Sequence, residues 1–520
     1  MTDDVQINGR WQPANKLEED RVEKLNTLRE RGVAPYPARV TRTHTAAEAI
    51  AAYEAHIAAN GEESEEPTPE VTVTGRIRRF NVRGKIAFLH IEDQTGRVQL
   101  FIRINSVGEE QFALIKDKLV DMDDFVQATG TMMRTKTGEI SVNTQDFTLL
   151  SKSISPLPLV KEEKRDDGTV IEHGEFTNVE VRYRQRYADL AVNRWVRDVF
   201  MKRAVAVKAL RNFMDDEDFL EVETPILQPI YGGAAARPFV THHNQLDQDL
   251  YLRISFELYL KRLLVGGIDA VYEIGRDFRN EGVSFKHNPE FTQLEFYKAY
   301  IDYKDVMDIT ERMVAYTAQQ VNGSMTTTFQ GEEIDFTPPW PRLTLREAIK
   351  NGTGIDYMDY PEAADLAAAM RENDMKVKDG AAWGQLIDGL LTAIEPDLRQ
   401  PTILMDYPRD ISPFAKRIDG DDFHTERFEF FIAGMEMGNA FTELNDPLDQ
   451  EQRFLDMAQI YSEGSDEETP LDDDYLRAMR YGMPPNGGFG MGVDRLVMLL
   501  TDQRNIRDVL LYPHLREEQK

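Results

Sequence analysis

The chain has 520 residues, 41% of them hydrophobic and 29% charged, which is the composition of an ordinary globular protein with room for more than one domain. It has no cysteine, which excludes disulfides and thiolate metal sites, and its net charge of −30 repels polyanions unless basic residues are concentrated locally. No apolar run approaches the roughly 20 residues that span a bilayer, and the acidic start is unlike a signal peptide, so we expect a cytoplasmic protein without a membrane partner.

Residues 1–61 are predicted to form two helices. The first covers 16–32, where apolar side chains recur at helical spacing before a glycine. The second is expected to begin after Thr45, because Thr45 and Glu48 have the spacing of a capping box. A charged, proline-containing linker over 62–70 follows, so this helical segment is predicted to be separate from what comes next.

Residues 71–150 are predicted to form a small five-stranded β-barrel of the OB-fold type. Five short β-rich runs are separated by turn residues. The segment contains 11 Lys/Arg and 10 Asp/Glu, a net charge of +1 in a very acidic chain. Such a local concentration suits a polyanion-binding face, and a barrel with merely basic turns is the alternative. The basic residues that cluster at its start are Arg76, Arg78, Arg79, Arg83 and Lys85.

A charged connector over 151–180 is predicted to lead into one large domain over 181–517. Long helices and strands alternate there, which predicts an α+β fold, with a mostly helical insertion near 341–425. We interpret the acidic stretch at 462–474 as a solvated loop.

The segment 279–296, RNEGVSFKHNPEFTQLEF, is patterned as two strands joined by a loop. Because strand side chains alternate, Arg279 and Glu281 are predicted to share one face of the first strand, and Glu295 and Tyr297 one face of the second. Charges on a buried face need partners, which a ligand carrying both signs would supply. The alternative is a ladder of ion pairs on an edge strand.

A second constellation lies in FEFFIAGMEMGNAFTELND. Asn439, Phe441 and Glu443 are predicted to alternate onto one face, and Glu429 and Glu436 flank the preceding strand. Two carboxylates placed this way, without Cys or His, suit a hard cation such as Mg²⁺ that bridges phosphates.

A third constellation is GFGMGVDR. The alternate glycines Gly488, Gly490 and Gly492 would let a ligand approach the backbone closely, and Arg495 opens an apolar helix. The glycine spacing matches neither common nucleotide-binding loop, so this stretch alone does not identify the ligand.

Taken together, these stretches resemble a known family. FLEVETP (219–225), FRNEG followed by HNPEF (278–291) and GFGMGVDR (488–495) are similar, in order and separation, to the three motifs of class II aminoacyl-tRNA synthetases. GGAAARPFVTHHN (232–244) and ELYLKRLLVGG (257–267) further resemble the lysyl-tRNA synthetases of class II, and the resemblance covers nearly the whole chain.

That resemblance implies a fold, an activity and partners. The barrel would bind the anticodon, and the catalytic domain would be an antiparallel sheet flanked by helices. The enzyme would activate L-lysine with ATP to lysyl-adenylate, release pyrophosphate, and transfer lysine to the 3′ end of tRNA(Lys). Mg²⁺ would be the cofactor, and the chain would form a homodimer to which 211–225 contributes.

Arg279 and Arg495 are the catalytic residues that the resemblance implies. Arg279 would hold the lysine carboxylate and the α-phosphate of ATP together, and Arg495 would lie near the phosphates; such electrostatic clamping is a main protein contribution to this chemistry. Glu429 and Glu436 would hold Mg²⁺. The residues implied for ATP binding are Arg279, Glu281, His287, Phe291 and Arg495.

Lysine recognition is implied for a pocket of carboxylates, because lysine brings two ammonium groups. Glu257 would take the α-amino group, whereas Glu295 and Glu443 would take the ε-amino group. Paired acids disfavour the short acidic or amide side chains that related aspartyl and asparaginyl enzymes accept. The full implied set is Gly233, Glu257, Arg279, Glu295, Tyr297, Asn439, Phe441 and Glu443.

The barrel is implied to read the tRNA anticodon. Phe88 would stack on a base, while Gln99 and Glu139 would read base edges. Two alternatives stand beside this interpretation. A relative that modifies a protein instead of tRNA would generally lack the barrel, and a catalytically silent scaffold would be expected to lack motif residues that are present here.

Overall fold

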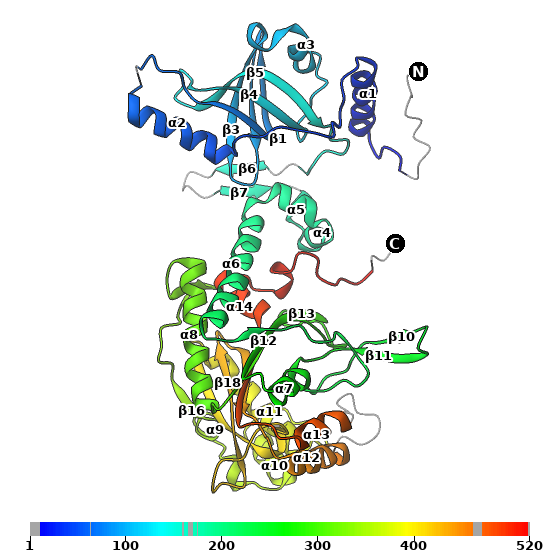
Figure 1. Cartoon of the computed structure of the whole chain (residues 1–520), viewed down its shortest axis with the longest axis vertical. Helices are drawn as coiled ribbons and strands as arrows, with labels where there is room; N and C mark the ends of the chain where they lie inside the picture. The colour runs from blue at the N-terminus through cyan, green and yellow to red at the C-terminus, as the bar shows by residue number, and fades with distance from the viewer. Residues whose placement is uncertain are drawn as a thin grey trace. The chain divides into compact units, whose positions relative to one another are not determined.

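The structure, a computed structural model, divides into two compact units, Met1–Glu175 and Phe176–Lys520 (Figure 1). Among the described residues, no helix is long and apolar enough to cross a membrane. Most of the predicted acidic loop at 462–474, and a part of the predicted connector at 151–180, lie outside the described residues. Those described are 11–62, 64–158, 161–164, 170–173, 175–460 and 471–517.

Two helices precede the barrel, α1 (Lys16–Glu30) and α2 (Ala46–Asn60). The predicted capping box of α2 is confirmed. The Glu48 backbone N–H donates to Thr45 Oγ1 at 3.2 Å, and the Thr45 backbone N–H donates to Glu48 Oε2 at 2.8 Å. These reciprocal bonds satisfy donors that a helix start otherwise leaves unpaired, which is why the helix begins there.

Five strands close into a barrel in the order β1-β2-β3-β5-β4, as the OB-fold prediction requires. The pairs are antiparallel except β3 and β5, whose parallel pairing closes the barrel. A helix that the sequence analysis did not predict, α3 (Ile104–Lys116), joins β3 to β4. The strands are β1 (Glu70–Arg83), β2 (Ile86–Glu92), β3 (Arg97–Arg103), β4 (Phe125–Arg134) and β5 (Ile140–Ser151).

The second unit is built on an eight-stranded sheet in the order β16-β17-β18-β19-β20-β13-β12-β8. The five central pairs are antiparallel, as predicted, but both edge pairs are parallel. Each edge strand is joined to its neighbour by a long connection that contains at least one helix, because parallel strands need such a crossover. The strands are β8 (Leu220–Glu221), β12 (Ala270–Phe278), β13 (Glu290–Ala299), β16 (Arg342–Thr344), β17 (Thr402–Pro408), β18 (His424–Ile432), β19 (Met435–Thr442) and β20 (Asn486–Gly492).

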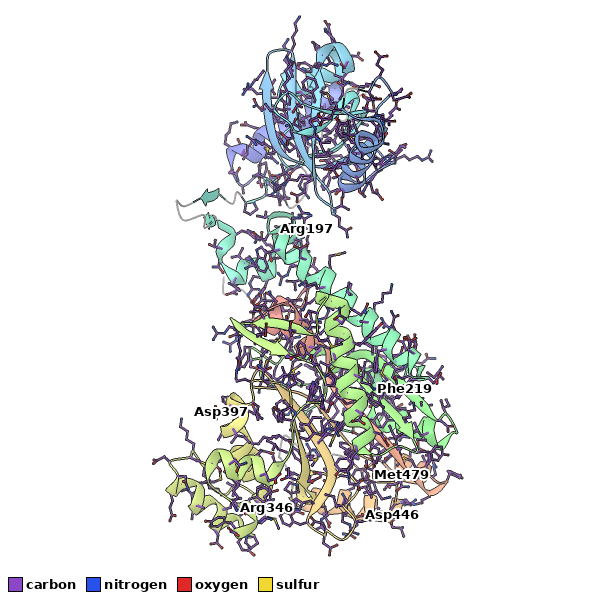
Figure 2. All side chains as sticks on the ribbon, turned by 90° about the vertical axis from the view of Figure 1, so that its left-hand side faces the viewer. Arg197, Phe219, Arg346, Asp397, Asp446 and Met479 are labelled. Atoms are coloured by element: carbon purple, nitrogen blue, oxygen red, sulfur yellow. The ribbon has the colours of Figure 1, made fainter. Side chains whose placement is uncertain are left out.

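Two long helices and one short helix cover one face of this sheet (Figure 1). Leu294 and Phe296 of β13 are fully buried in the core beneath them. Phe219, labelled in Figure 2, packs edge-on against Phe296 with 5.0 Å between ring centroids. The helices are α6 (Arg194–Asp216), α8 (Tyr303–Asn322) and α14 (Val493–Leu500).

The other face of β13 packs partly against α7 (Glu257–Val265). Tyr297 lies there in a small core with Phe256 and Val271. Because alternate residues of a strand point to opposite faces, Glu295 lies on the same side as Tyr297. This face carries the polar residues of the predicted site.

Part of the predicted helical insertion at 341–425 has its own core. Its first and last strands, β16 and β17, nevertheless belong to the main sheet, so the insertion is not wholly helical. Its main helices are α9 (Leu345–Thr353), α10 (Ala363–Glu372) and α11 (Trp383–Ile394). The remaining helices and strands are α4 (Val179–Arg184), α5 (Arg186–Val192), α12 (Pro447–Ile460), α13 (Asp473–Arg480), β6 (Lys161–Lys164), β7 (Val170–His173), β9 (Leu227–Gln228), β10 (Val240–His243), β11 (Gln248–Leu252), β14 (Thr326–Phe329) and β15 (Glu332–Asp335).

Candidate active site

Strand pairing brings residues that are far apart in the sequence into two rows on one face of the sheet. Each row crosses β18, β19, β20 and β13, so its members are direct cross-strand neighbours. The register therefore joins all three constellations that the sequence analysis singled out. One row contains Glu429, Asn439, Gly490 and Glu295, and the next contains Arg427, Phe441, Gly488 and Tyr297.

The glycines of β20 make room for side chains of the neighbouring strands. A Cβ on Gly488 would lie 1.9 Å from Glu443 Oε1 and 2.5 Å from Tyr297 Cε1. A Cβ on Gly490 would lie 3.0 Å from Gln293 Nε2. The prediction that these glycines serve a ligand's close approach is thus incomplete, because protein side chains already lie against two of them.

A cavity of about 350 Å³ lies over these rows, a size suited to small molecules. The residues predicted for the lysine, ATP and metal sites line it, with one exception. Glu443 lies behind Gly488 and is fully buried. The predicted residues that line the cavity are Gly233, Glu257, Arg279, Glu281, His287, Phe291, Glu295, Tyr297, Glu429, Glu436, Asn439, Phe441 and Arg495.

Glu295 is the central acid of the cavity and is 2% exposed. Its Oε1 accepts from Ser255 Oγ at 2.8 Å and from Gln293 Nε2 at 3.0 Å, and its Oε2 accepts from Tyr297 OH at 3.2 Å. Burial, reinforced by the nearby Asp277 carboxylate, raises the pKa of Glu295 well above its usual range. These donors are neutral, so a cation in the cavity would stabilise the ionised carboxylate.

Glu257 lies at the start of α7 and is also buried. Gly233 approaches it closely: a Cβ there would lie 3.0 Å from both Glu257 Cβ and Ser255 Oγ. Gly233 also has a φ of +86°, which favours glycine. The predicted need for glycine at this position therefore has two physical causes.

Arg279 and Glu281 lie in a loop rather than on the predicted strand. β12 ends at Phe278, because β13 begins only at Glu290 and the preceding Pro289 has no backbone N–H to donate to a ladder. The Arg279 guanidinium carbon lies 5.2 Å from the centroid of the Phe291 ring. The loop still places Arg279 on the cavity wall.

Arg495 and His287 both line the cavity and contact each other, with Arg495 Nη2 3.2 Å from His287 Nε2. An arginine only donates, so His287 Nε2 accepts, and the Nδ1–H donates to Ser284 Oγ at 2.8 Å. Burial, followed by the charge of Arg495, lowers the pKa of His287 to about 4. The imidazole is therefore neutral at pH 7.

Glu429 and Glu436 are the carboxylates predicted to hold a metal. Glu429 accepts from Arg427 Nη2 at 2.7 Å and from Tyr407 OH at 2.9 Å, and burial, reinforced by Glu436, raises its pKa to about 7. For Glu436, burial would raise the pKa, but the combined charges of Arg495 and other nearby cations outweigh burial and lower the pKa. No cluster of three or more metal-binding side chains occurs among the described residues. Two carboxylates fit Mg²⁺ that takes its other ligands from phosphates and water.

Arg427 and Lys261 are cavity-region residues that the sequence analysis missed. Arg427 Nε donates to Asn439 Oδ1 at 3.0 Å, so it links the predicted lysine site to Glu429. Lys261 Nζ lies 2.6 Å from Glu257 Oε1. Their spacing could have indicated these pairs. Arg427 lies two residues before Glu429 on a strand, so both point to one face, and Lys261 lies four residues after Glu257 on a helix, so the two are neighbours.

The barrel carries a separate candidate site, where the predicted anticodon residues lie on one outer face. Gln99 Nε2 donates to Glu139 Oε2 at 2.7 Å, and Phe88 lies 5.1 Å from Phe101 between ring centroids. His90 Nε2 lies 2.6 Å from Glu139 Oε1. Phe101 and His90 were not predicted, although each lies two residues from Gln99 or Phe88 on a strand.

Comparison with known proteins assigns both units to families. Residues 178–516 match the family described as tRNA synthetases class II (D, K and N). Residues 71–150 match the OB-fold nucleic acid binding domain. Together with the sheet and the cavity, these matches define a class II tRNA synthetase with an OB-fold domain.

Curated relatives are similar over nearly their whole length. The lysine–tRNA ligase of Chloroflexus aurantiacus is 50% identical over 508 residues, covering 97% of this chain and 99% of the relative. Those of Roseiflexus castenholzii and Carboxydothermus hydrogenoformans are 51% and 47% identical, covering 96% and 97% of this chain and 99% of each relative. The chain belongs to the lysine–tRNA ligase family of class II tRNA synthetases, which confirms the resemblance seen in the sequence.

Proposed function

We propose that this chain is a lysine–tRNA ligase. It activates L-lysine with ATP to lysyl-adenylate and pyrophosphate, and then transfers the lysyl group to the 3′ end of tRNA(Lys). The observation that carries this proposal is a single cavity that combines the buried carboxylates Glu257 and Glu295 with the guanidinium groups of Arg279 and Arg495. Lysine and ATP together bring the charges that such a cavity would neutralise.

Lysine binds with its α-ammonium at Glu257 and its ε-ammonium at Glu295 and Tyr297. Each buried acid gains an opposite charge, which offsets the cost of burying it. An aspartate side chain would instead face like charge, and an asparagine side chain would leave the acid without a cation. Asn439 and Phe441, which also line the cavity, complete the walls around the aliphatic part of lysine.

Adenylate formation is a displacement at the α-phosphorus of ATP. An oxygen of the lysine carboxylate attacks phosphorus, and the bond to pyrophosphate breaks. This carboxylate is already ionised at neutral pH, so no general base is needed. Arg279 stabilises the charge that develops between the two reactants, and Arg495 does so near the phosphates. Phe291 supports the adenine, and the neutral His287 and Glu281 contact ATP.

Glu429 and Glu436 would hold Mg²⁺ when ATP is bound. The ion would offset the negative charge of the phosphates. Arg427 fixes the Glu429 carboxylate from the side by its 2.7 Å hydrogen bond, so this acid is oriented before the substrates arrive.

The barrel binds the anticodon of tRNA(Lys) through the face that contains Phe88, Gln99 and Glu139. Phe88 and its neighbour Phe101 offer aromatic surface for base stacking. Gln99 and Glu139, which are hydrogen-bonded to each other, read base edges.

The chain acts as a homodimer. Exposed apolar side chains lie in the segment 211–225 and directly after it: Leu220, Ile226 and Leu227 are 52%, 45% and 48% exposed. Apolar side chains grouped on a surface favour burial against a partner. Light scattering after size exclusion should give twice the chain mass at micromolar concentration, and a stable monomer would contradict the proposal.

Lysine-dependent ATP–pyrophosphate exchange, measured without tRNA against a panel of amino acids, tests the proposed function. Exchange with lysine alone, strongly reduced by Glu295→Gln, is the expected result. Exchange with aspartate or asparagine would overturn the assignment of the acids, and no exchange with any amino acid would overturn the enzyme itself.

A further inference from the structure

Lys261 is a buried cation beside the lysine end of the cavity that the proposed chemistry does not use. It lies on α7, one turn after Glu257, and its side chain is fully buried. Its Nζ is 2.6 Å from Glu257 Oε1 and also forms an ion pair with Glu443. Lys261 therefore joins two of the three carboxylates assigned to substrate lysine.

Aromatic rings separate this ammonium from the cavity. Lys261 Nζ is 4.9 Å from the ring centroid of Phe414, 5.5 Å from that of Phe441 and 5.7 Å from that of Tyr297. Phe441 and Tyr297 line the cavity, whereas Lys261 is not among the described residues that do. Behind the rings, Phe414 and Phe441 share a buried cluster with Met479, labelled in Figure 2. Lys261 can thus act on the cavity only through its partners.

Glu443 lies directly against Gly488, which lines the cavity. Its Oε1 lies where a Cβ on Gly488 would be, at a separation of 1.9 Å, and its side chain is fully buried. Its backbone N–H donates to the Asn486 carbonyl at 2.8 Å. The carboxylate therefore has little room to move, and it meets Lys261 on one side and Gly488 on the other.

The charges of the three acids balance those of the bound substrate only if Lys261 is also charged. Burial alone would lower the pKa of Lys261, but Glu257 and Glu443 raise it above its usual range, so it stays charged. With Glu295, three acids face one lysine, which leaves two negative charges for the two ammonium groups of the substrate. The other groups that face the ammonium or these acids are Tyr297 and Gln293 of β13, Tyr475 of α13, Asp277 of β12 and Arg427 of β18.

We propose that Lys261 is a permanent counter-ion that sets the charge of the lysine pocket, and is thereby a positioning and specificity-determining residue. Burial raises the pKa of Glu257 and of Glu443, and the Lys261 ammonium opposes this effect. By pairing with both acids, it favours their ionised forms and holds them in place for a dicationic amino acid. Without it, three neighbouring buried acids repel one another and retain protons, which the substrate must then displace. This role rests on the proposed function of the cavity.

Lys261→Met tests the role, because methionine keeps much of the volume and removes the charge. In pyrophosphate exchange at pH 7, we expect the KM for lysine to rise at least tenfold, with a smaller change in kcat and in the KM for ATP. We also expect the KM for lysine to fall as the pH rises from 7 to 8.5, because the acids then lose their retained protons. Lys304→Met, at an exposed lysine of α8, is the matched control and should match the wild type.

The Glu443→Gln background identifies the route of the effect. Lys261→Met should raise the KM for lysine no more than threefold there, because Glu257 and Glu295 then leave the same two negative charges for the substrate as in the wild type. This comparison also remains decisive if Lys261→Met alone fails to fold. The double variant has one unpaired buried carboxylate fewer than the single variant, so it is expected to fold more readily. A tenfold or larger rise in that background overturns the route through Glu443.

Exchange by the wild-type chain distinguishes failure of the counter-ion role from failure of the proposed function. Wild-type exchange with lysine, together with an unchanged KM and an unchanged pH profile in a folded Lys261→Met variant, overturns the counter-ion role alone. Absence of exchange in the wild type overturns the proposed function instead.

Discussion

The cavity of the second unit and the outer face of the barrel both place glutamates beside aromatic rings, but in opposite environments. Glu295 in the cavity is 2% exposed, whereas the side chain of Glu139 on the barrel is 45% exposed. Buried acids attract a cation strongly because desolvation makes their charge costly, while an exposed acid contributes mainly hydrogen bonds. The cavity is therefore suited to select by charge, and the barrel face to select by stacking and hydrogen bonding.

The largest effect should come from Arg279, because its guanidinium faces charge that develops during the reaction. We expect Arg279→Ala to lower kcat/KM for pyrophosphate exchange about 10³-fold, or roughly 4 kcal/mol, as for a lost oxyanion donor. Arg276→Ala removes a partly exposed arginine of β12, the strand that ends just before Arg279, and should cost less than threefold. A similar loss of kcat/KM in both variants would mean that the loss reflects a disturbed local structure and not the missing Arg279 guanidinium.

Glu295 should come next, since it supplies the charge that selects lysine. Glu295→Gln should raise the KM for lysine about 100-fold, or roughly 2.7 kcal/mol, because one hydrogen-bonded ionic contact is lost while the shape is kept. The KM for ATP should change little. Glu290→Gln, at a partly exposed acid of the same strand, is the control. Equal changes in both KM values would argue against selective contact with lysine.

On the barrel, removing one aromatic ring should affect tRNA and leave adenylation intact. Phe88→Ala should raise the KM for tRNA(Lys) in aminoacylation by about tenfold, or roughly 1.4 kcal/mol, which is within the range of about 1–3 kcal/mol for stacking of one base. Pyrophosphate exchange without tRNA should be unchanged. Phe125→Ala removes a partly exposed ring elsewhere on the barrel and serves as the control. A loss of pyrophosphate exchange in Phe88→Ala would show that adenylation also depends on this ring of the barrel.

The order of elements was predictable, because it depends on local pattern. The capping box at Thr45 and the five β-rich runs of the barrel rest on residues close in the sequence, and both predictions are confirmed. The family was also predictable, since its three motifs are short and specific. The edges of the large sheet were not predictable. β8 pairs with β12 and β16 with β17, and each of these parallel pairs depends on a connection of tens of residues.

Within the site, the sequence favoured residues that carry motif chemistry and missed those that support them. Lys261 and Arg427 act by pairing with acids, and such pairs depend on three-dimensional distance. Gly488 was interpreted as room for a ligand, because a sequence does not reveal that Glu443 lies against it. The contacts in the structure therefore identify the charged residues that pair with the acids of the site. The roles assigned to single residues, the homodimer and the cytoplasmic location stay predictions.

The smallest expected effect concerns pH, and it tests whether burial sets the charge of the cavity. Burial raises the pKa of Asp277 to about 7, and Asp277 faces Glu295. As the pH rises from 6 to 8, Asp277 loses its proton and the region becomes more negative, so the KM for lysine should fall about threefold, a change of roughly 0.6 kcal/mol. Asp277→Asn should flatten this profile, because an amide does not titrate. The KM for tRNA in the same variant should follow the wild-type profile, since the barrel face has no part in this titration. A profile that is as steep in Asp277→Asn as in the wild type would assign the titration to another acid of the cavity, and an inverse slope would contradict charge selection by buried carboxylates.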